Sequence, residues 1–179
     1  MIDTPQTNTQ NVLEHGISVA KHFNQLMKGD TNNWKLPTWF TDNKDFIFNN
    51  LHILEDIKEY HVMHDCGKSY CMTIDEQGKR HFSNHAQVSF DTFSKISDNK
   101  VVADLILKDM VFHTIKADEV EDFVKNNSIQ TVLTLLVTAL CELHSNATMF
   151  GGIESTSFKI KYKQLDKRGK QVLSLLNIK

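Results

Sequence analysis

The stretch DFIFNNLHILEDIKEYHVMHDCGK, residues 45–68, decides the fold that the sequence predicts. Apolar residues recur through most of it at helical spacing, and Gly67 lets the backbone leave a helix tightly. His64 and Asp65 stand together where that helix ends, and Lys68 follows them. A neutral imidazole nitrogen beside an anionic carboxylate oxygen offers a divalent ion two donors. The stretch therefore predicts a helix whose C-terminal end offers two candidate metal donors.

Within this stretch the apolar periodicity predicts a helix over residues 45–63. The same periodicity predicts further helices on both sides of the stretch. Their expected ranges are 10–27, 84–96, 99–113, 117–125, 129–146 and 156–176. Only 2 prolines and 7 glycines interrupt the chain, which disfavours a loop-rich or all-β fold. The sequence therefore predicts an all-α fold of six or seven helices, in a single compact domain over residues 1–179.

Four segments are expected to lie outside these helices. Residues 1–9 are polar and read as a flexible start, while residues 28–43 form a loop anchored by aromatic side chains. Residues 69–82 are expected to form a non-helical segment with a turn, and residues 149–152 are expected to interrupt the helices. Residues 156–179 are expected to form a C-terminal basic helix.

Charge, cysteines and hydropathy narrow the class of protein. The formal net charge of -2 gives no general attraction to nucleic acid, so phosphate binding must come from local patches. Three cysteines without a signal peptide are typical of free thiols in a reducing compartment. The longest apolar run, residues 132–141, is too short to span a bilayer. We therefore expect a cytoplasmic protein that does not enter the membrane. The sequence leaves open whether the protein forms a homo-oligomer.

Histidines are concentrated in the middle of the chain. The sequence holds nine, and His61, His64, His81 and His85 fall within 25 residues. Such a cluster indicates metal binding or acid–base chemistry, because imidazole titrates near neutral pH and ligates metals.

Four stretches carry a resemblance to a known superfamily. They are EHGISVA (14–20), HDCGK (64–68), GKRHFSNHAQVS (78–89) and ALCELHSNA (139–147). Together they resemble the HD superfamily of metal-dependent phosphohydrolases, and the middle stretches are most similar to the HD domain attached to bacterial CCA-adding enzymes. The resemblance covers roughly residues 12–150 and includes no nucleotidyltransferase half.

The resemblance also implies a set of metal ligands. The family uses a first His on an early helix, the His-Asp pair and a later Asp. This sequence departs from the family at the later Asp, because Glu142 stands at that position. Asp109 is the alternative candidate for this acidic ligand. A set for one or two ions is then His15, His64, Asp65, His85, Asp109 and Glu142. Mixed nitrogen and oxygen ligands favour Mn, Fe, Co, Ni or Zn.

The implied activity is hydrolysis of a phosphomonoester or phosphodiester by metal-activated water, on a nucleotide or an RNA terminus. Asp65 and Lys68 are the expected catalytic residues. The residues expected to contact substrate phosphates are Lys68, His81, Lys159 and Lys161. The last two belong to the basic run 158–170, in which Phe158 and Tyr162 could stack on a base.

Other readings of the same residues stay open. The His-Asp-x-Gly-Lys end could be a plain helix C-cap, and the lysine run could be a solvated helix face. Some HD proteins with the same ligand set bind two irons and oxidise organic substrates with O₂, so a di-iron oxygenase is a rival function. A non-catalytic module that binds a nucleotide or a partner protein is the second rival.

Overall fold

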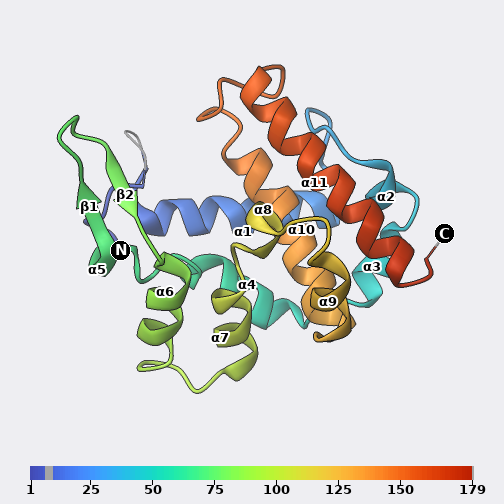
Figure 1. Cartoon of the computed structure of the whole chain (residues 1–179), viewed down its shortest axis with the longest axis horizontal. Coiled ribbons are helices and arrows are strands. Elements are labelled where there is room, and N and C mark those ends of the chain that lie inside the picture. Colours follow the sequence, from blue (N-terminus) through green and yellow to red (C-terminus); the bar gives the residue numbers. More distant parts are fainter. Residues whose placement is uncertain (7–9, 179) are drawn as a thin grey trace. The chain divides into compact units, whose positions relative to one another are not determined.

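The computed structural model describes residues 1–6 and 10–178. The chain folds as two compact units, each built from two stretches of sequence. The first unit combines Met1–Ala20 with Ile53–Met110, and the second combines Lys21–His52 with Val111–Lys179. The described residues are mostly helical, which confirms the predicted all-α class (Figure 1). The expectation of a single domain stays a prediction.

The described residues of the first unit form one small sheet and five helical pieces. Its elements are the first part of α1 (Val12–Lys28), then α4 (Leu54–Met63), α5 (Lys68–Cys71), β1 (Met72–Ile74), β2 (Arg80–Phe82), α6 (His85–Phe93) and α7 (Lys100–Leu107). β1 and β2 pair antiparallel with Thr73 opposite His81, so the segment expected to be non-helical contains a hairpin. Helix α7 packs against both α4 and α6, and Figure 1 shows α6 and α7 side by side.

The chain start is tied to the beginning of α1. The Val12 amide donates to the Thr4 carbonyl at 2.9 Å, and the Gln6 amide donates to the Gln10 carbonyl at 2.9 Å. Thr4 is buried. The predicted flexible start includes residues 7–9, which lie outside the described residues.

The second unit is organised around one buried helix. Its elements are the last part of α1, α2 (Thr38–Thr41), α3 (Lys44–Asn49), α8 (Val111–Thr114), α9 (Val120–Lys125), α10 (Ile129–Ser145) and α11 (Thr156–Leu175). Every residue of α10 from Thr131 to His144 is buried, as expected for a helix that is apolar on all sides. Helix α11 packs against α2, α8, α9 and α10. No helix among the described residues is long and apolar enough to cross a bilayer.

Three long helices match their predicted ranges closely. They are α1, α10 and α11, whose observed ends lie within two residues of the expected ones. Ser128 and Ser155 cap α10 and α11, because each side chain accepts a hydrogen bond from an amide three residues ahead.

Two predicted helices are wrong in their extent. The helix expected over residues 45–63 is broken between α3 and α4, and the helix expected over residues 99–113 is broken between α7 and α8. At the first break the His52 amide donates to the Thr134 hydroxyl at 3.1 Å rather than continuing a helix. The chain crosses from one unit to the other at both places.

Helix α11 contains Gly169, which is buried against the Trp39 indole of α2. A Cβ at this position would stand well inside van der Waals distance of three ring atoms. Although alanine favours a helix interior by about 1 kcal/mol, we expect Gly169→Ala to lower the free energy of unfolding by about 1–3 kcal/mol, because overpacking forces the ring to move.

Urea unfolding measures this loss, and Gln164→Ala on the exposed side of α11 is the matched control. A Gly169→Ala protein as stable as the wild type would show that the indole moves aside at no cost.

Candidate metal centre

Asp65 is the centre of the candidate site in the first unit. It follows His64, the C-terminal cap of α4, and each of the two side chains is only about 2 % exposed. A buried carboxylate is costly unless charges or hydrogen bonds compensate it. The groups that face Asp65 therefore define what the site can do.

Three imidazoles face this carboxylate from different elements of the same unit. Nε2 of His15 and Nε2 of His64 lie 3.8 and 3.3 Å from Asp65 Oδ2. Nε2 of His85 lies 3.7 Å from Oδ1. His15 belongs to α1, and His85 is the first residue of α6. The structure thus brings together four of the residues that the sequence proposed as metal ligands.

Backbone carbonyls orient two of these rings. Nδ1 of His64 lies 2.8 Å from the His61 carbonyl oxygen, and Nδ1 of His85 lies 3.0 Å from the Phe82 carbonyl oxygen. A carbonyl oxygen only accepts, so each Nδ1 carries the proton and donates it. In the neutral imidazole Nε2 then keeps its lone pair, and such a backbone contact is the usual way a metal-binding histidine is held.

The spacing of these atoms suits a cation. Asp65 Oδ1 is buried and has no hydrogen-bond partner among the described residues. Two atoms bonded to one ion at about 2.1 Å stand about 3–3.5 Å apart, close to the separations found here. The ligand atoms of His15 and His64, both buried, also lie within 4.8 Å of one another.

The polar groups around Asp65 keep its carboxyl ionised. Burial raises the pKa of the Asp65 carboxyl, but His64 and Lys68 outweigh that effect and hold the pKa well below its usual range. Burial lowers the pKa of His85, although the nearby Asp65 partly offsets this. An anionic carboxylate and a neutral imidazole are the protonation states that ligate metals.

Lys68 is the cation of the site. Its Nζ donates to Asp65 Oδ2 at 2.6 Å and to Gln6 Oε1 at 2.9 Å. The same ammonium lies 5.2 Å from the centre of the Phe82 ring, and the residue is 7 % exposed. The lysine is therefore held beside the carboxylate and does not extend into solvent.

Two glycines let the helices around the site approach closely. A Cβ on Gly16 would lie 2.7 Å from the His61 carbonyl oxygen, so α1 and α4 touch backbone to backbone next to His15. A Cβ on Gly67 would collide with the backbone of Ser89 in α6, and the Gly67 amide donates to the Ser89 hydroxyl at 2.9 Å. Neither place has room for a side chain.

Asp109 is a buried acid of the same unit. The Tyr60 hydroxyl donates to its Oδ1 at 2.5 Å, and the Tyr60 ring packs edge-on against the His64 ring. Tyr60 precedes His64 by one helical turn on α4. The expectation that Asp109 ligates metal stays a prediction.

Glu142 belongs to α10 in the second unit. It is 6 % exposed, and its Oε2 lies 2.6 Å from His113 Nε2 on α8. Its proposed role as the later acidic ligand is untested.

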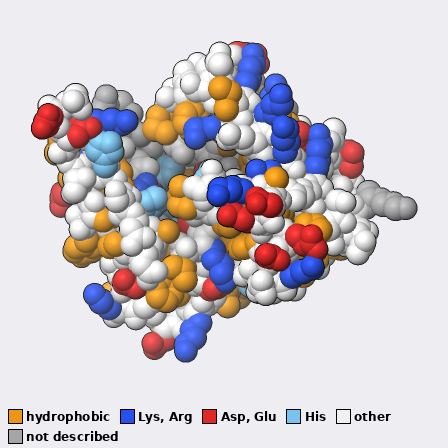
Figure 2. All heavy atoms as spheres, in the orientation of Figure 1, with side chains coloured by type: hydrophobic (Ala, Val, Ile, Leu, Met, Phe, Trp, Pro, Cys, Tyr) orange, Lys and Arg blue, Asp and Glu red, His pale blue; other side chains and the backbone are white. Residues whose placement is uncertain are grey.

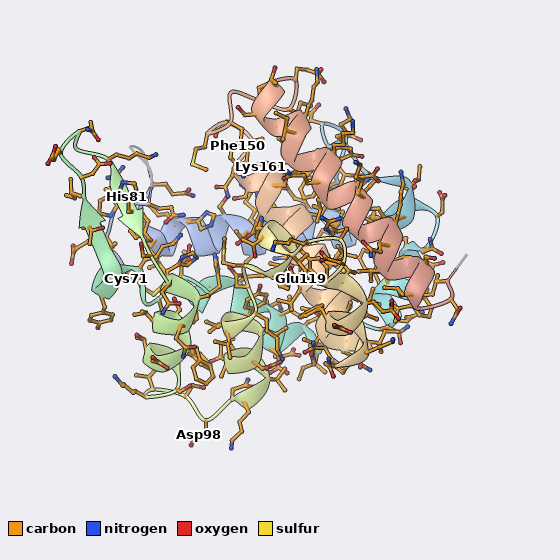
Figure 3. All side chains as sticks on the ribbon, viewed as in Figure 1. Cys71, His81, Asp98, Glu119, Phe150 and Lys161 are labelled. Atoms are coloured by element: carbon orange, nitrogen blue, oxygen red, sulfur yellow. The ribbon has the colours of Figure 1, made fainter. Side chains whose placement is uncertain are left out.

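The other residues proposed to contact substrate are more exposed. His81 on β2 lies 2.7 Å from Asp75 at the hairpin turn and has 43 % of its side chain exposed (Figure 3). Lys159 and Lys161 are exposed on α11 in the second unit, where Lys161 lies over the Phe150 ring (Figure 3). Phe158 is fully buried, so its expected stacking on a base is ruled out in this structure.

The sequence analysis missed two side chains that contact residues of the candidate site, Gln6 and Tyr60. Gln6 lies in the segment expected to be flexible, and nothing in the sequence marks it as a partner of Lys68. Tyr60 could have been found, because a residue four positions before His64 shares its helix face.

Comparisons of the chain with protein-family models, with curated proteins and with solved structures found no match.

Proposed function

We propose that this protein is a metal-dependent phosphohydrolase of the HD type. The observation that supports the proposal most directly is the buried Asp65 carboxylate, which three imidazole Nε2 atoms and one ammonium face. One carboxylate cannot balance three protonated imidazoles together with a lysine. Neutral imidazoles whose Nε2 lone pairs face the carboxylate explain this arrangement better than protonated ones. Such imidazoles and a carboxylate can ligate the same divalent cation.

His15, His64 and Asp65 would hold the first ion. His85 faces the other carboxylate oxygen of Asp65, so a second ion would have His85 and Asp65 as ligands. When bound, a divalent ion lowers the pKa of a water from 15.7 to roughly 7, which makes hydroxide available at neutral pH.

Lys68 would stabilise the charge that builds up on a phosphoryl group. Its ammonium has three donors, and two are engaged by Asp65 and Gln6. The third is left for a phosphoryl oxygen, and preorganised donors of this kind need no rearrangement during the reaction. The substrate class proposed is a nucleotide or an RNA end.

Phosphate release tests the proposal. Metal-stripped protein receives Mn, Co, Ni, Mg or Fe and is assayed on nucleoside mono-, di- and triphosphates, on 2′,3′-cyclic nucleotides and on phosphorylated RNA ends. We expect release that depends on the metal, because only a metal-activated water supplies hydroxide at neutral pH.

Two comparisons make the result decisive. Release should vanish in Asp65→Ala and persist in Asp75→Ala, which removes a partly exposed aspartate that also pairs with a histidine. Folded protein that releases no phosphate with any metal contradicts the proposal. Iron-dependent oxygen uptake would then favour the di-iron oxygenase, and nucleotide binding without turnover would favour the binding module.

A further inference from the structure

Helix α11 presents a stripe of lysines away from its buried face. The stripe consists of Lys159, Lys163, Lys167 and Lys170, all exposed. At about 100° per residue these positions fall within an arc of about 80°. The buried residues of the same helix, which include Leu165 and Val172, lie on the opposite side. Figure 2 shows Lys and Arg side chains along the surface over α11.

Lys163 and Lys167, at the centre of the stripe, lack the acid four residues earlier that pairs with other lysines of the chain. Elsewhere in the chain Lys108 pairs with Asp104, and Lys125 pairs with Glu121, each four residues earlier on its helix. On α11 the residues four positions before and after Lys163 are lysines too. Like charges at this spacing destabilise a helix. A plain solvated face gains nothing from such an arrangement.

Ion pairs compensate the charge at the two ends of the stripe but not at its centre. Lys159 pairs with Glu154, and Lys170 pairs with Asp166, both at 2.8 Å. Within residues 1–6 and 10–178, Lys163 and Lys167 form no ion pair. A chain with a formal net charge of -2 therefore carries a lysine stripe about 16 Å long, whose two central lysines have no acidic partner among the described residues.

We propose that the α11 lysine stripe binds the phosphodiester backbone of a nucleic acid. A regular line of cations complements a regular line of phosphates, and neutralised phosphates release their counterions. An anionic membrane fits less well, because a membrane-bound amphipathic helix inserts its apolar face, and here that face is packed in the second unit. The proposal does not depend on the proposed hydrolysis, since the stripe is defined without Asp65 or its partners.

Salt dependence of binding tests the proposal. The probe is a fluorescent 20-nucleotide oligouridylate with hydroxyl ends, titrated with the full chain at 50 and 200 mM salt. Four contacts to a single strand predict a slope of about -2.8 for log affinity against log salt, so this change should weaken binding roughly fiftyfold.

Lys163→Gln with Lys167→Gln should halve the slope, so that the same change of salt weakens binding only about sevenfold. Both positions are exposed, and circular dichroism checks that the helix is kept. Lys58→Gln with Lys95→Gln removes the same charge from exposed sites of the first unit and should behave as wild type. An unchanged slope in the α11 variant would overturn the proposal. Binding to phosphatidylserine vesicles without binding to the oligouridylate would overturn it as well.

Discussion

Asp65→Asn is expected to abolish metal retention and hydrolysis while leaving a folded protein. The substitution keeps the shape of the side chain but removes the charge that faces His15, His64 and His85. Loss of a group that merely supports a ligand costs about 10- to 100-fold in metal affinity. A group placed between three imidazoles should cost more, so we expect a loss of more than about 100-fold.

Three measurements separate a lost ligand from a lost fold. Mass spectrometry of the metal after gel filtration gives its content, calorimetry with Mn gives its affinity, and thermal melting gives stability. Asp65→Asn leaves the Lys68 ammonium buried without its carboxylate, so some destabilisation of metal-free protein is expected. Asp65→Glu keeps that charge and controls for it. Asp75→Asn, at a partly exposed aspartate that also faces a histidine, is the matched control. Wild-type metal content in Asp65→Asn would refute this account of the site.

Local signals in the sequence predicted the long helices well. Helices α10 and α11 begin at serine caps, and apolar residues recur at helical spacing after each cap. Both serious errors lie where the chain passes between the two units, after His52 and after Met110. The hydrogen bond from His52 to Thr134 joins residues 82 positions apart. Periodicity within a window of fewer than 20 residues contains no information about such contacts.

The candidate site also contains residues that the local sequence predicts and residues that it does not predict. The neighbouring residues His64, Asp65 and Lys68 were visible as one local pattern. Only the resemblance to a family could add His15 and His85, because nothing in their spacing shows that α1 and α6 meet the end of α4. The backbone carbonyls that fix the imidazoles have no sequence signature. Neither does the contact of Gln6 with Lys68.

A buried histidine of the second unit should make the protein sensitive to acid. His144 in the last turn of α10 is 6 % exposed, and its ring stacks on the Trp34 ring with centroids 4.4 Å apart. Its Nε2 donates to the Lys35 carbonyl oxygen at 3.2 Å. Burial, and to a smaller extent the nearby His22, lower the pKa of His144 from 6.5 to about 4, although the hydrogen bond to the Lys35 carbonyl partly offsets them. The folded protein therefore keeps this imidazole neutral at pH values where the unfolded chain protonates it.

The sign of the effect follows from this difference in proton binding. Below pH 6.5 the unfolded state binds one more proton than the folded state, so stability falls as the pH falls towards 4. The difference between a pKa of 6.5 and one of about 4, at 1.36 kcal/mol per pH unit, predicts a loss of about 3 kcal/mol between pH 7 and pH 4. Urea unfolding at several pH values measures it. His144→Phe keeps an aromatic ring against Trp34 and cannot titrate, so its stability should fall by about 3 kcal/mol less than that of the wild type. If both proteins lose the same amount, protonated His144 is accommodated in the fold, and other groups must account for the acid sensitivity.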